Sequence, residues 1–451
     1  MKSIDKLRQA HLSAPLDYTQ RVHYLGLLAE KLKSSQEEIM QALSLDLGKG
    51  RFESWSTEIG FLLQEITHLQ KTLPDLMEPQ KVSTPIVMQP GSSYIYHEPY
   101  GVVLVMAPWN YPIQLAFSPL IGALAAGNRV VVKPSELTPH CADLIAKIVK
   151  EIFPEDLVQV VLGGVQETGE LLKEKFDYIF FTGSTQVGKV VMRAAAEHLT
   201  PVTLELGGKS PCLIDRNTNL KMIARRVAWG KWMNAGQTCV APDYLLVHRS
   251  DLQVLKQELK NAIQQFYSTN PKASEDFGRI VSLKHFDRLK NLLDQTPVLL
   301  GGDSVREERF MAPTVLGPVD WEAAIMQDEI FGPLLPIIVY DQVSEVIAKI
   351  KARPKPLAFY LFTNDEGLQK RVLSEISFGG GCVNDTIMHL ANPRLPFGGV
   401  GESGMGAYHG DLSFYTFSHR KSVFKQTTLI DVPVRYPPYK GKEGLVKFLV
   451  K

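Results

Sequence analysis

The feature that most constrains the fold of this chain is a series of short apolar runs that alternate with helical segments from Gly101 onward. A segment such as CADLIAKIVKEIF has apolar residues at helical spacing, and the runs are GVVLVMAP (101–108), NRVVVKPS (128–135), LVQVVLGG (157–164) and YIFFTGS (178–184). Strands that are apolar throughout are buried on both faces, and the intervening helices cover those faces. The pattern predicts an α/β fold with a doubly wound parallel sheet, whose ligands bind at the carboxyl ends of the strands.

A second α/β series begins after Gly208, with the runs SPCLIDR, DYLLVHR, LLPIIVY and LAFYLFT. The first 75 or so residues have apolar positions at helical spacing and predict a helical opening. Between that opening and the first strand, KVSTPIVMQPGSSYIYHEPYG alternates β-forming residues with Pro and Gly. This segment predicts a hairpin that reaches out of the main body, and an exposed hairpin edge requires a partner strand.

Charge and cysteine content disfavour several classes of function. Lys and Arg (49) nearly balance Asp and Glu (48), so the chain has no excess charge with which to hold nucleic acid or an anionic membrane. The four cysteines are widely separated and lack C-x-x-C spacing, which suggests neither a disulfide framework nor a structural zinc site. We therefore expect no metal and expect any thiol chemistry to come from one cysteine acting alone.

The two ends of the chain predict a cytoplasmic protein without a membrane anchor. The start, MKSIDKLRQAHLSAPLDYTQR, lacks the apolar core and the cleavage site of a secretory signal. No uninterrupted apolar run approaches the roughly 20 residues that a membrane helix requires. The tail, GKEGLVKFLVK, is apolar only briefly and carries several lysines, so we expect a loose terminus.

The segment FFTGSTQVGKVV (180–191) follows a predicted strand and begins a helix. Gly183 and Gly188 bracket a turn whose backbone amides can face a phosphate at the helix N-terminus, as in a dinucleotide site. Thr185 replaces the second glycine of the usual dinucleotide fingerprint. The segment nearly spells a P-loop, but Val190 stands where a hydroxyl would bind magnesium, which disfavours a nucleotide hydrolase. On these residues alone, a plain strand-to-helix turn is an equal alternative.

The segment VVVKPSE ends another predicted strand with Lys133 and Glu136, three positions apart. A carboxylate at the carboxyl end of a strand can accept hydrogen bonds from ribose hydroxyls. Taken alone, the two residues fit a solvated pair beside a proline turn better.

The segment NAGQTCVAPDY places Cys239 after a Gly-Gln-Thr turn and a helical stretch, where nearby backbone amides can favour a thiolate. The thiolate is the nucleophilic form, and an ordinary thiol with a pKa of about 8.5 is only slightly ionised near neutrality. A free cysteine is more often a small buried hydrophobic residue, and we assign that role to the other three, Cys141, Cys212 and Cys382.

Two further polar residues lie at predicted strand ends. Glu205, in VTLELGGKSP, precedes two glycines, where the backbone can approach closely and a carboxylate can act as a general base. Asn110, in APWNYP, lies in a rigid loop between prolines and can donate to an oxyanion, a contact worth roughly 2.7 to 4 kcal/mol. Taken singly, they are more typical of a solvated carboxylate and a turn residue.

Together, and in this order, the segments resemble the aldehyde dehydrogenase superfamily: PWNYP, VVKPSE, FTGSTQVG, LELGGKSP, GQTC, EIFGP and PFGGVGESGMG. The short N-terminus, the APDY after the cysteine and RYPPY near the end resemble its class 3 branch. Members of that branch act on medium-chain, long-chain or aromatic aldehydes and commonly form dimers. The resemblance implies a doubly wound cofactor domain, an α/β catalytic domain and a small β oligomerisation element.

Carried over position by position, the resemblance implies that Cys239 is the nucleophile and Glu205 the base that activates water for thioester hydrolysis. Asn110 and the backbone amide of Cys239 would form the oxyanion hole. Glu329 would bond the nicotinamide ribose, and Phe331 would pack near the nicotinamide. The full set implied for binding NAD or NADP is Lys133, Glu136, Gly183, Ser184, Gly188, Glu329 and Phe331.

The resemblance also implies the domain organisation. Residues 1–80 and 100–207 would form the cofactor domain, and residues 208–394 the catalytic domain. Residues 81–99 and 415–430 would form the oligomerisation element of a homodimer, and the return segment to the cofactor domain would be 395–414.

Several alternatives stay open at this point. Glu136 favours NAD, whereas class 3 relatives often accept NADP as well, and Gln186 replaces the small or charged residues of relatives. A relative that transfers the acyl group to coenzyme A generally lacks the glutamate at position 205. A protein that keeps the fold without turnover is disfavoured by the intact site residues. We expect the aldehyde range to depend on pocket walls formed by Tyr111, Trp232, Met233 and residues 387–391.

Overall fold

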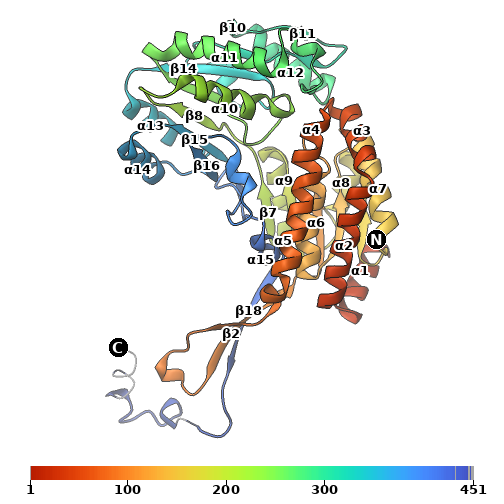
Figure 1. Ribbon diagram of the computed structural model, residues 1–451. Coiled ribbons are helices and arrows are strands. Elements are labelled where there is room, and N and C mark those ends of the chain that lie inside the picture. Colours follow the sequence, from red (N-terminus) through yellow and green to blue (C-terminus); the bar gives the residue numbers. More distant parts are fainter. Residues whose placement is uncertain (1, 432, 445–446, 448–451) are drawn as a thin grey trace.

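The computed structural model describes residues 2–431, 433–444 and 447, and it contains two α/β bodies and a projecting β arm (Figure 1). Most of the tail for which we predicted a loose terminus lies outside the described residues. In the part of the chain that is described, no helix is long and apolar enough to cross a membrane.

The first body is built on a six-stranded sheet in the order β17-β7-β6-β3-β4-β5. Five of its strands are parallel, and β17 pairs antiparallel with β7. The strands are β3 (Val102–Met106), β4 (Arg129–Lys133), β5 (Val158–Val160), β6 (Tyr178–Thr182), β7 (Val202–Glu205) and β17 (Gly404–Met405). The predicted doubly wound parallel sheet is therefore confirmed.

Helices cover both faces of this sheet, and α6 (Gln114–Ala126) is buried along its whole length. The other helices that follow its strands are α7 (Pro139–Ile152), α8 (Val165–Leu171) and α9 (Thr185–Ala196). The predicted helical opening comprises α1 (Lys2–Ser13), α2 (Tyr18–Ser34), α3 (Gln36–Leu47), α4 (Arg51–Ser54), the π-helical turn η1 (Trp55–Ile59) and α5 (Gly60–Met77). It packs against α6, α7 and the sheet.

The second body has a seven-stranded sheet in the order β10-β13-β14-β9-β8-β15-β16, parallel except for β10. Its strands are β8 (Pro211–Ile214), β9 (Tyr244–His248), β10 (Val298–Leu300), β13 (Thr314–Leu316), β14 (Leu334–Tyr340), β15 (Ala358–Phe362) and β16 (Gly380–Val383). Its helices are α10 (Leu220–Trp232), α11 (Leu252–Tyr267), α12 (Leu283–Asp294), α13 (Val343–Lys351) and α14 (Glu366–Glu375). The short pair β11 (Ser304–Val305) and β12 (Phe310–Met311) stands apart.

The arm is a three-stranded antiparallel sheet that leaves the first body near α15 (Asp411–Thr416) (Figure 1). The predicted hairpin forms its strands β1 (Gln80–Val82) and β2 (Ser92–Pro99). The third strand, β18 (Ser418–Lys425), pairs along the whole of β2 and is mostly exposed. Within the described chain, β18 and β16 are both edge strands whose outer edges have no partner strand.

Candidate active site

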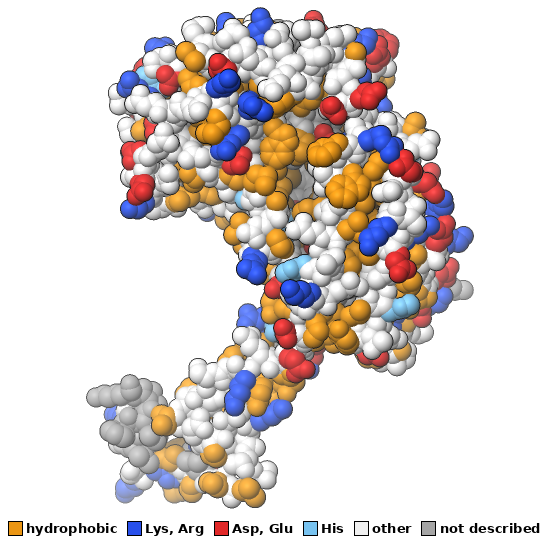
Figure 2. All heavy atoms as spheres, viewed as in Figure 1, with side chains coloured by type: hydrophobic (Ala, Val, Ile, Leu, Met, Phe, Trp, Pro, Cys, Tyr) orange, Lys and Arg blue, Asp and Glu red, His pale blue; other side chains and the backbone are white. Residues whose placement is uncertain are grey.

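A cleft of about 570 Å³ lies between the two bodies, and its lining combines opposite ends of the two sheets. From the first body come residues 108–110, 182–186 and 205–209, which follow the carboxyl ends of β3, β6 and β7. From the second body come Pro211 and Tyr244, the first residues of β8 and β9. Hydrophobic side chains gather where the bodies meet (Figure 2). The cleft therefore lies at the expected carboxyl ends of the strands in the first sheet, but at the amino ends of the strands in the second sheet.

The turn before Cys239 is held in an uncommon backbone conformation. After α10, residues Asn234 and Ala235 have φ values of 50° and 52°, and Gly236 follows with 76°. A Cβ at Gly236 would lie 2.2 Å from the carbonyl oxygen of Gly332, so only glycine fits there. The Gln237 amide donates to the Asn234 carbonyl at 3.1 Å. These contacts explain the glycine and the glutamine that precede the cysteine in the motif.

Cys239 lines the cleft as a half-buried side chain. Burial raises the pKa of its thiol well above the ordinary range, and the carboxyl groups of Glu329 and Glu205 raise this pKa further. The backbone amides of Cys239 and Val240 act in the opposite direction. The predicted amides are present and favour a thiolate, but in this conformation burial and the two carboxyl groups outweigh them.

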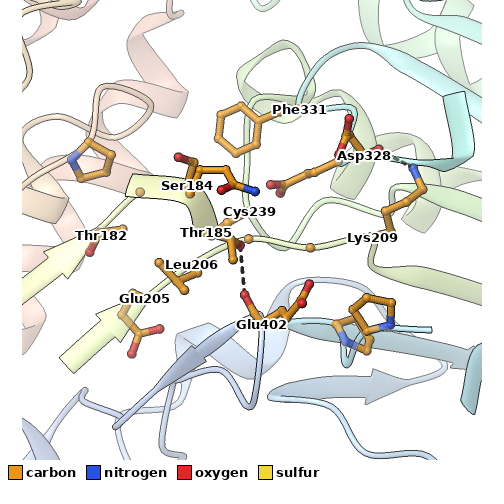
Figure 3. Close-up of a pocket in the computed structure, with 18 of the residues that line it drawn as sticks. Thr182, Ser184, Thr185, Glu205, Leu206, Lys209, Cys239, Asp328, Phe331 and Glu402 are labelled. Carbon is orange, nitrogen blue, oxygen red and sulfur yellow. Dashed lines mark hydrogen bonds between the residues drawn. The ribbon is translucent and has the colours of Figure 1, made fainter. Parts of the chain in front are cut away.

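Glu205 ends β7 and is only 2% exposed. Neither of its carboxyl oxygens has a hydrogen-bond partner among the described residues, and burial raises the pKa of this group well above its usual range. Figure 3 shows the carboxyl group pointing away from Cys239. The alternative of a solvated strand-end glutamate is therefore wrong, and Glu205 is a buried carboxylic acid beside the cleft.

The loop of Asn110 is bonded directly to the cysteine turn. The Asn110 side-chain amide donates to the carbonyl oxygen of Gln237 at 3.0 Å. The Asn110 carbonyl accepts from the Asn234 side chain at 2.7 Å and from Lys49 Nζ at 3.3 Å. A primary amide has two N–H groups, so one stays available for a ligand. The structure thus brings Asn110, Glu205 and Cys239 together in one cleft.

The turn after β6 forms part of the cleft wall, where Gly183 and Ser184 both line it. The Ser184 hydroxyl caps α9 by accepting from the Val187 amide at 3.4 Å, and the Gly183 amide donates to the Glu205 carbonyl at 3.0 Å. Gly188 lies outside the lining, and a Cβ on it would come within 2.7 Å of Leu206. This glycine lets α9 pack closely against Leu206, and its predicted contact with the cofactor stays a prediction.

Lys133 and Glu136 lie at the end of β4, at the same edge of the sheet but outside the cleft lining. Lys133 is 4% exposed, and its Nζ donates to the Pro134 carbonyl at 2.8 Å and to Glu136 at 3.5 Å. A solvated pair is therefore wrong for Lys133, whereas the Glu136 side chain is 46% exposed. An exposed carboxylate beside a buried ammonium suits a ligand hydroxyl.

Glu329 and Phe331 line the cleft opposite the glycines that follow Glu205. Burial raises the pKa of Glu329 to about 8, with a further contribution from Asp243. A Cβ on Gly207 would lie 2.0 Å from Glu329 Oε2. The glycine after β7 therefore leaves space for the Glu329 carboxyl group. The Phe331 ring packs edge-on against Trp109, with centroids 5.2 Å apart.

The sequence analysis missed Lys209, which lines the cleft beside Glu329. Its Nζ donates to Asp243 at 2.5 Å and to the carbonyl of Asp328 at 2.8 Å (Figure 3). This lysine ties the loop after Glu205 to the segment of Glu329. In the sequence, Lys209 directly follows LELGG and Asp243 lies in APDY, and both stand out as charged residues in apolar surroundings. Nothing in the sequence indicates that they form a pair.

Two further predictions need correction. Trp232 is 1% exposed and donates to the Pro333 carbonyl at 2.9 Å, so it belongs to the core and is no pocket wall. Cys382 is half-buried, with its sulfur 3.5 Å from His389 Nδ1, because its strand β16 lies at a sheet edge. Cys141 and Cys212 are buried as predicted.

Comparison with known proteins identifies the family. The family model "Aldehyde dehydrogenase family" matches residues 7–423. The chain is 50% identical to 4,4'-diaponeurosporen-aldehyde dehydrogenase of Staphylococcus aureus over 96% of this chain and 95% of that protein. It is 48% identical to the dimeric NADP-preferring aldehyde dehydrogenase of Rattus norvegicus, over 94% of each chain. The solved structure of substrate-bound Staphylococcus aureus AldH superposes with a TM-score of 0.98 at 48% identity, covering 100% of this chain and 99% of that one.

These findings agree with the motifs and with the two-sheet cleft. They confirm the predicted superfamily and its class 3 branch. The chain belongs to the aldehyde dehydrogenase family, whose members oxidise aldehydes with NAD or NADP.

Proposed function

We propose that this chain oxidises aldehydes to carboxylic acids with NAD or NADP, through a thiohemiacetal and a thioester on Cys239. The observation that supports this most directly is that Cys239, Glu205 and Asn110, far apart in sequence, line one cleft. A thiol, a carboxyl group and an amide donor are the set that acyl chemistry with hydrolysis requires. The presence of Glu205 disfavours transfer to coenzyme A, and the complete set disfavours a protein without turnover.

The cleft fits a dinucleotide. The N-terminus of α9 opens onto it with Ser184, Thr185 and Gln186 in its lining, and a helix N-terminus favours a phosphate. Because Gly207 has no side chain, it leaves room for the carboxyl group of Glu329, and any side chain at this position would occupy that room. In the proposal, Gly183 and Ser184 hold the pyrophosphate, Lys133 and Glu136 the adenosine ribose, and Glu329 with Phe331 the nicotinamide portion. When bound, the cofactor accepts the hydride.

In the first half-reaction, the Cys239 sulfur attacks the aldehyde carbon as its thiolate. The second N–H of the Asn110 amide and the backbone amide of Cys239 stabilise the oxyanion that forms. Loss of hydride from that carbon leaves the thioester. Since burial and two carboxyl groups keep the resting thiol protonated, we propose that nucleophile formation depends on proton loss as substrate and cofactor fill the cleft.

In the second half-reaction, Glu205 accepts a proton from water as that water attacks the thioester carbon. The carbon–sulfur bond of the thioester breaks, and the products are the carboxylic acid, the Cys239 thiolate and protonated Glu205; proton transfer from Glu205 to the thiolate restores the resting thiol. A buried carboxyl group with a raised pKa is a stronger base than an exposed one once it is ionised. Deacylation is therefore expected to speed up with rising pH.

We also propose a homodimer with the domain bounds 1–80 and 100–207 (cofactor), 208–394 (catalytic), 81–99 and 415–430 (oligomerisation) and 395–414 (return). The arm exposes the edge of β18, and β16 exposes another edge on the second body. Unpaired edges favour strand pairing between copies. The name of the rat relative, dimeric NADP-preferring, supports the same assembly. The cytoplasmic address stays a prediction.

For the substrate, we propose apolar aldehydes of medium or long chain, or aromatic ones. The name of the Staphylococcus aureus relative, a diaponeurosporen-aldehyde dehydrogenase, supports a preference for apolar substrates.

A direct test combines purified protein with NAD or NADP in parallel and a series of aldehydes from acetaldehyde through decanal to benzaldehyde, followed by reduced-cofactor absorbance. We expect signal with the apolar aldehydes and conversion to the free acid. Formation of acyl-coenzyme A when coenzyme A is added would instead support acyl transfer. No signal with any aldehyde would contradict turnover.

A further inference from the structure

A buried ion pair from the helical opening lies behind the reaction centre. The side chains of Lys49 and Glu58 are both 0% exposed, and Lys49 Nζ lies 2.5 Å from Glu58 Oε1. The cost of removing two charges from water largely offsets their attraction, and apolar residues often stabilise such a position equally well. The other contacts of the pair therefore indicate what it does.

The two members hold opposite ends of the Asn110 loop. Lys49 Nζ also donates to the Asn110 carbonyl at 3.3 Å. The second carboxylate oxygen of Glu58 accepts from the backbone amides of Ile113 and Gln114 at 3.0 and 2.9 Å. These amides lie at the start of α6, where a negative charge is favourable. The loop between the two anchors carries the Asn110 side chain.

The same helical segment also holds the cysteine turn. Glu53, which lies in α4, is close to the backbone amide of Asn234, and that amide lowers the pKa of the Glu53 carboxyl group. The Asn234 side chain donates to the Asn110 carbonyl, so this oxygen accepts from both Asn234 and Lys49. The Asn110 side chain in turn donates to the Gln237 carbonyl. The segment thus contacts both loops that meet at the reaction centre.

The backbone that carries Glu58 is itself unusual. Residues Trp55–Ile59 form a π-helical turn between α4 and α5. Such turns occur mostly as single bulges within α-helices and frequently lie at functional sites. Lys49 adds a contact with the neighbouring aromatic residue, since its Nζ lies 4.1 Å from the centroid of the Tyr111 ring.

We infer that Lys49 and Glu58 are positioning residues for aldehyde oxidation: they hold the Asn110 loop so that the Asn110 amide stays aimed at the oxyanion beside Cys239. This inference rests on the proposed role of Asn110. Neither residue lines the cleft, so neither touches the substrate, and both act through the loop.

The test uses two substitutions. K49M keeps an unbranched side chain but removes its positive charge, and E58Q removes the negative charge but keeps an oxygen that can accept from the α6 amides. We expect each to lower kcat on the order of 10- to 100-fold, the cost of a small misplacement at a reacting centre. The KM for NAD should be unchanged, because the cofactor contacts lie elsewhere. K49R, which keeps the charge and a donor, should recover part of the lost rate.

The matched control is the exposed pair of the same segment, Arg51 and Glu37, whose side chains are 70% and 66% exposed and 2.7 Å apart. R51M and E37Q should retain native kcat, because exposed ion pairs contribute little. Equal losses of rate in the exposed and buried pairs would overturn the inference.

A double-mutant cycle with N110A separates positioning from general destabilisation. If Lys49 acts through Asn110, K49M should lower kcat much less in the N110A background than in the native one. If K49M does not fold, as judged by thermal unfolding, the same cycle is run with E58Q. Full additivity in the cycle would overturn the inference. A native kcat in N110A alone would instead contradict the proposed role of Asn110.

Discussion

Two regions share one cleft but are built in opposite ways: the reaction centre, formed by Asn110, Glu205 and Cys239, and the turn after β6, residues 183–186, which we call the cofactor turn after its proposed role. At the reaction centre, Asn110 and Gln237 are joined across 127 positions of the chain, and Glu205 is buried without a polar partner among the described residues. In the cofactor turn, Ser184 bonds an amide three positions away and stays exposed. Burial therefore sets the chemistry of the first region, and local backbone geometry sets that of the second. Substitutions should accordingly affect turnover in one and cofactor affinity in the other.

The largest effect should follow from removing the nucleophile. C239A should lower aldehyde oxidation by a factor of about 10⁴ or more, since no thioester can form. Reduced-cofactor absorbance measures this loss, and cofactor binding followed by protein fluorescence should be unchanged. C382A is the matched control, because Cys382 is also half-buried but lies outside the cleft lining. Retained turnover in C239A would contradict the reaction centre.

The next effect should come from E205Q, which retains the shape of the side chain but cannot accept a proton. We expect kcat to fall by roughly 10² to 10⁴, the usual contribution of a general base. A rapid burst of reduced cofactor should persist, because acylation does not require this group. Rapid mixing measures both phases. Loss of the burst together with kcat would place Glu205 in the first half-reaction instead.

A smaller effect is expected from G207A on the cofactor side. The added Cβ would lie 2.0 Å from Glu329 Oε2 and would displace that carboxyl group. We expect the KM for NAD to rise by roughly tenfold, the equivalent of about one hydrogen bond. G169A is the control, since a Cβ at Gly169 meets nothing within 4 Å. A change in kcat with an unchanged KM for NAD would contradict the expectation that this region determines cofactor affinity rather than turnover.

The smallest effect concerns stability as a function of pH. Because burial raises the pKa of Glu205 in the folded protein, its contribution is fully present below the pKa of an unfolded glutamate, about 4.3. It is lost progressively as pH rises toward the folded pKa, since only the unfolded chain then ionises. E205Q lacks this titration, so its Tm relative to that of the native protein should increase with pH. Thermal unfolding across neutral and alkaline pH measures the difference, and a constant difference would contradict a buried neutral acid.

The errors of the sequence analysis share one cause. Trp232 belongs to a motif that lines the cleft in part, but its own side chain faces the core. Helical or strand spacing tells which residues share a face, whereas the identity of the neighbour across that face depends on packing between distant segments. Lys49 and Glu58 escaped notice for the same reason, since a lysine and a glutamate in a polar helical segment are normally solvated.

By itself, the sequence determined the two parallel sheets, the helical opening, the projecting hairpin, the turn after β6 and the motifs that identify the family. Apolar runs, helical spacing and turn residues are local signals, and these elements depend mainly on them. Only the tertiary structure decided that Cys239, beside the amino end of β9, meets the carboxyl ends of the other sheet, and that Glu205 is buried with a raised pKa. Burial, hydrogen-bond partners and pKa values arise from neighbours far away in the chain, and those neighbours are defined only once the two bodies pack together.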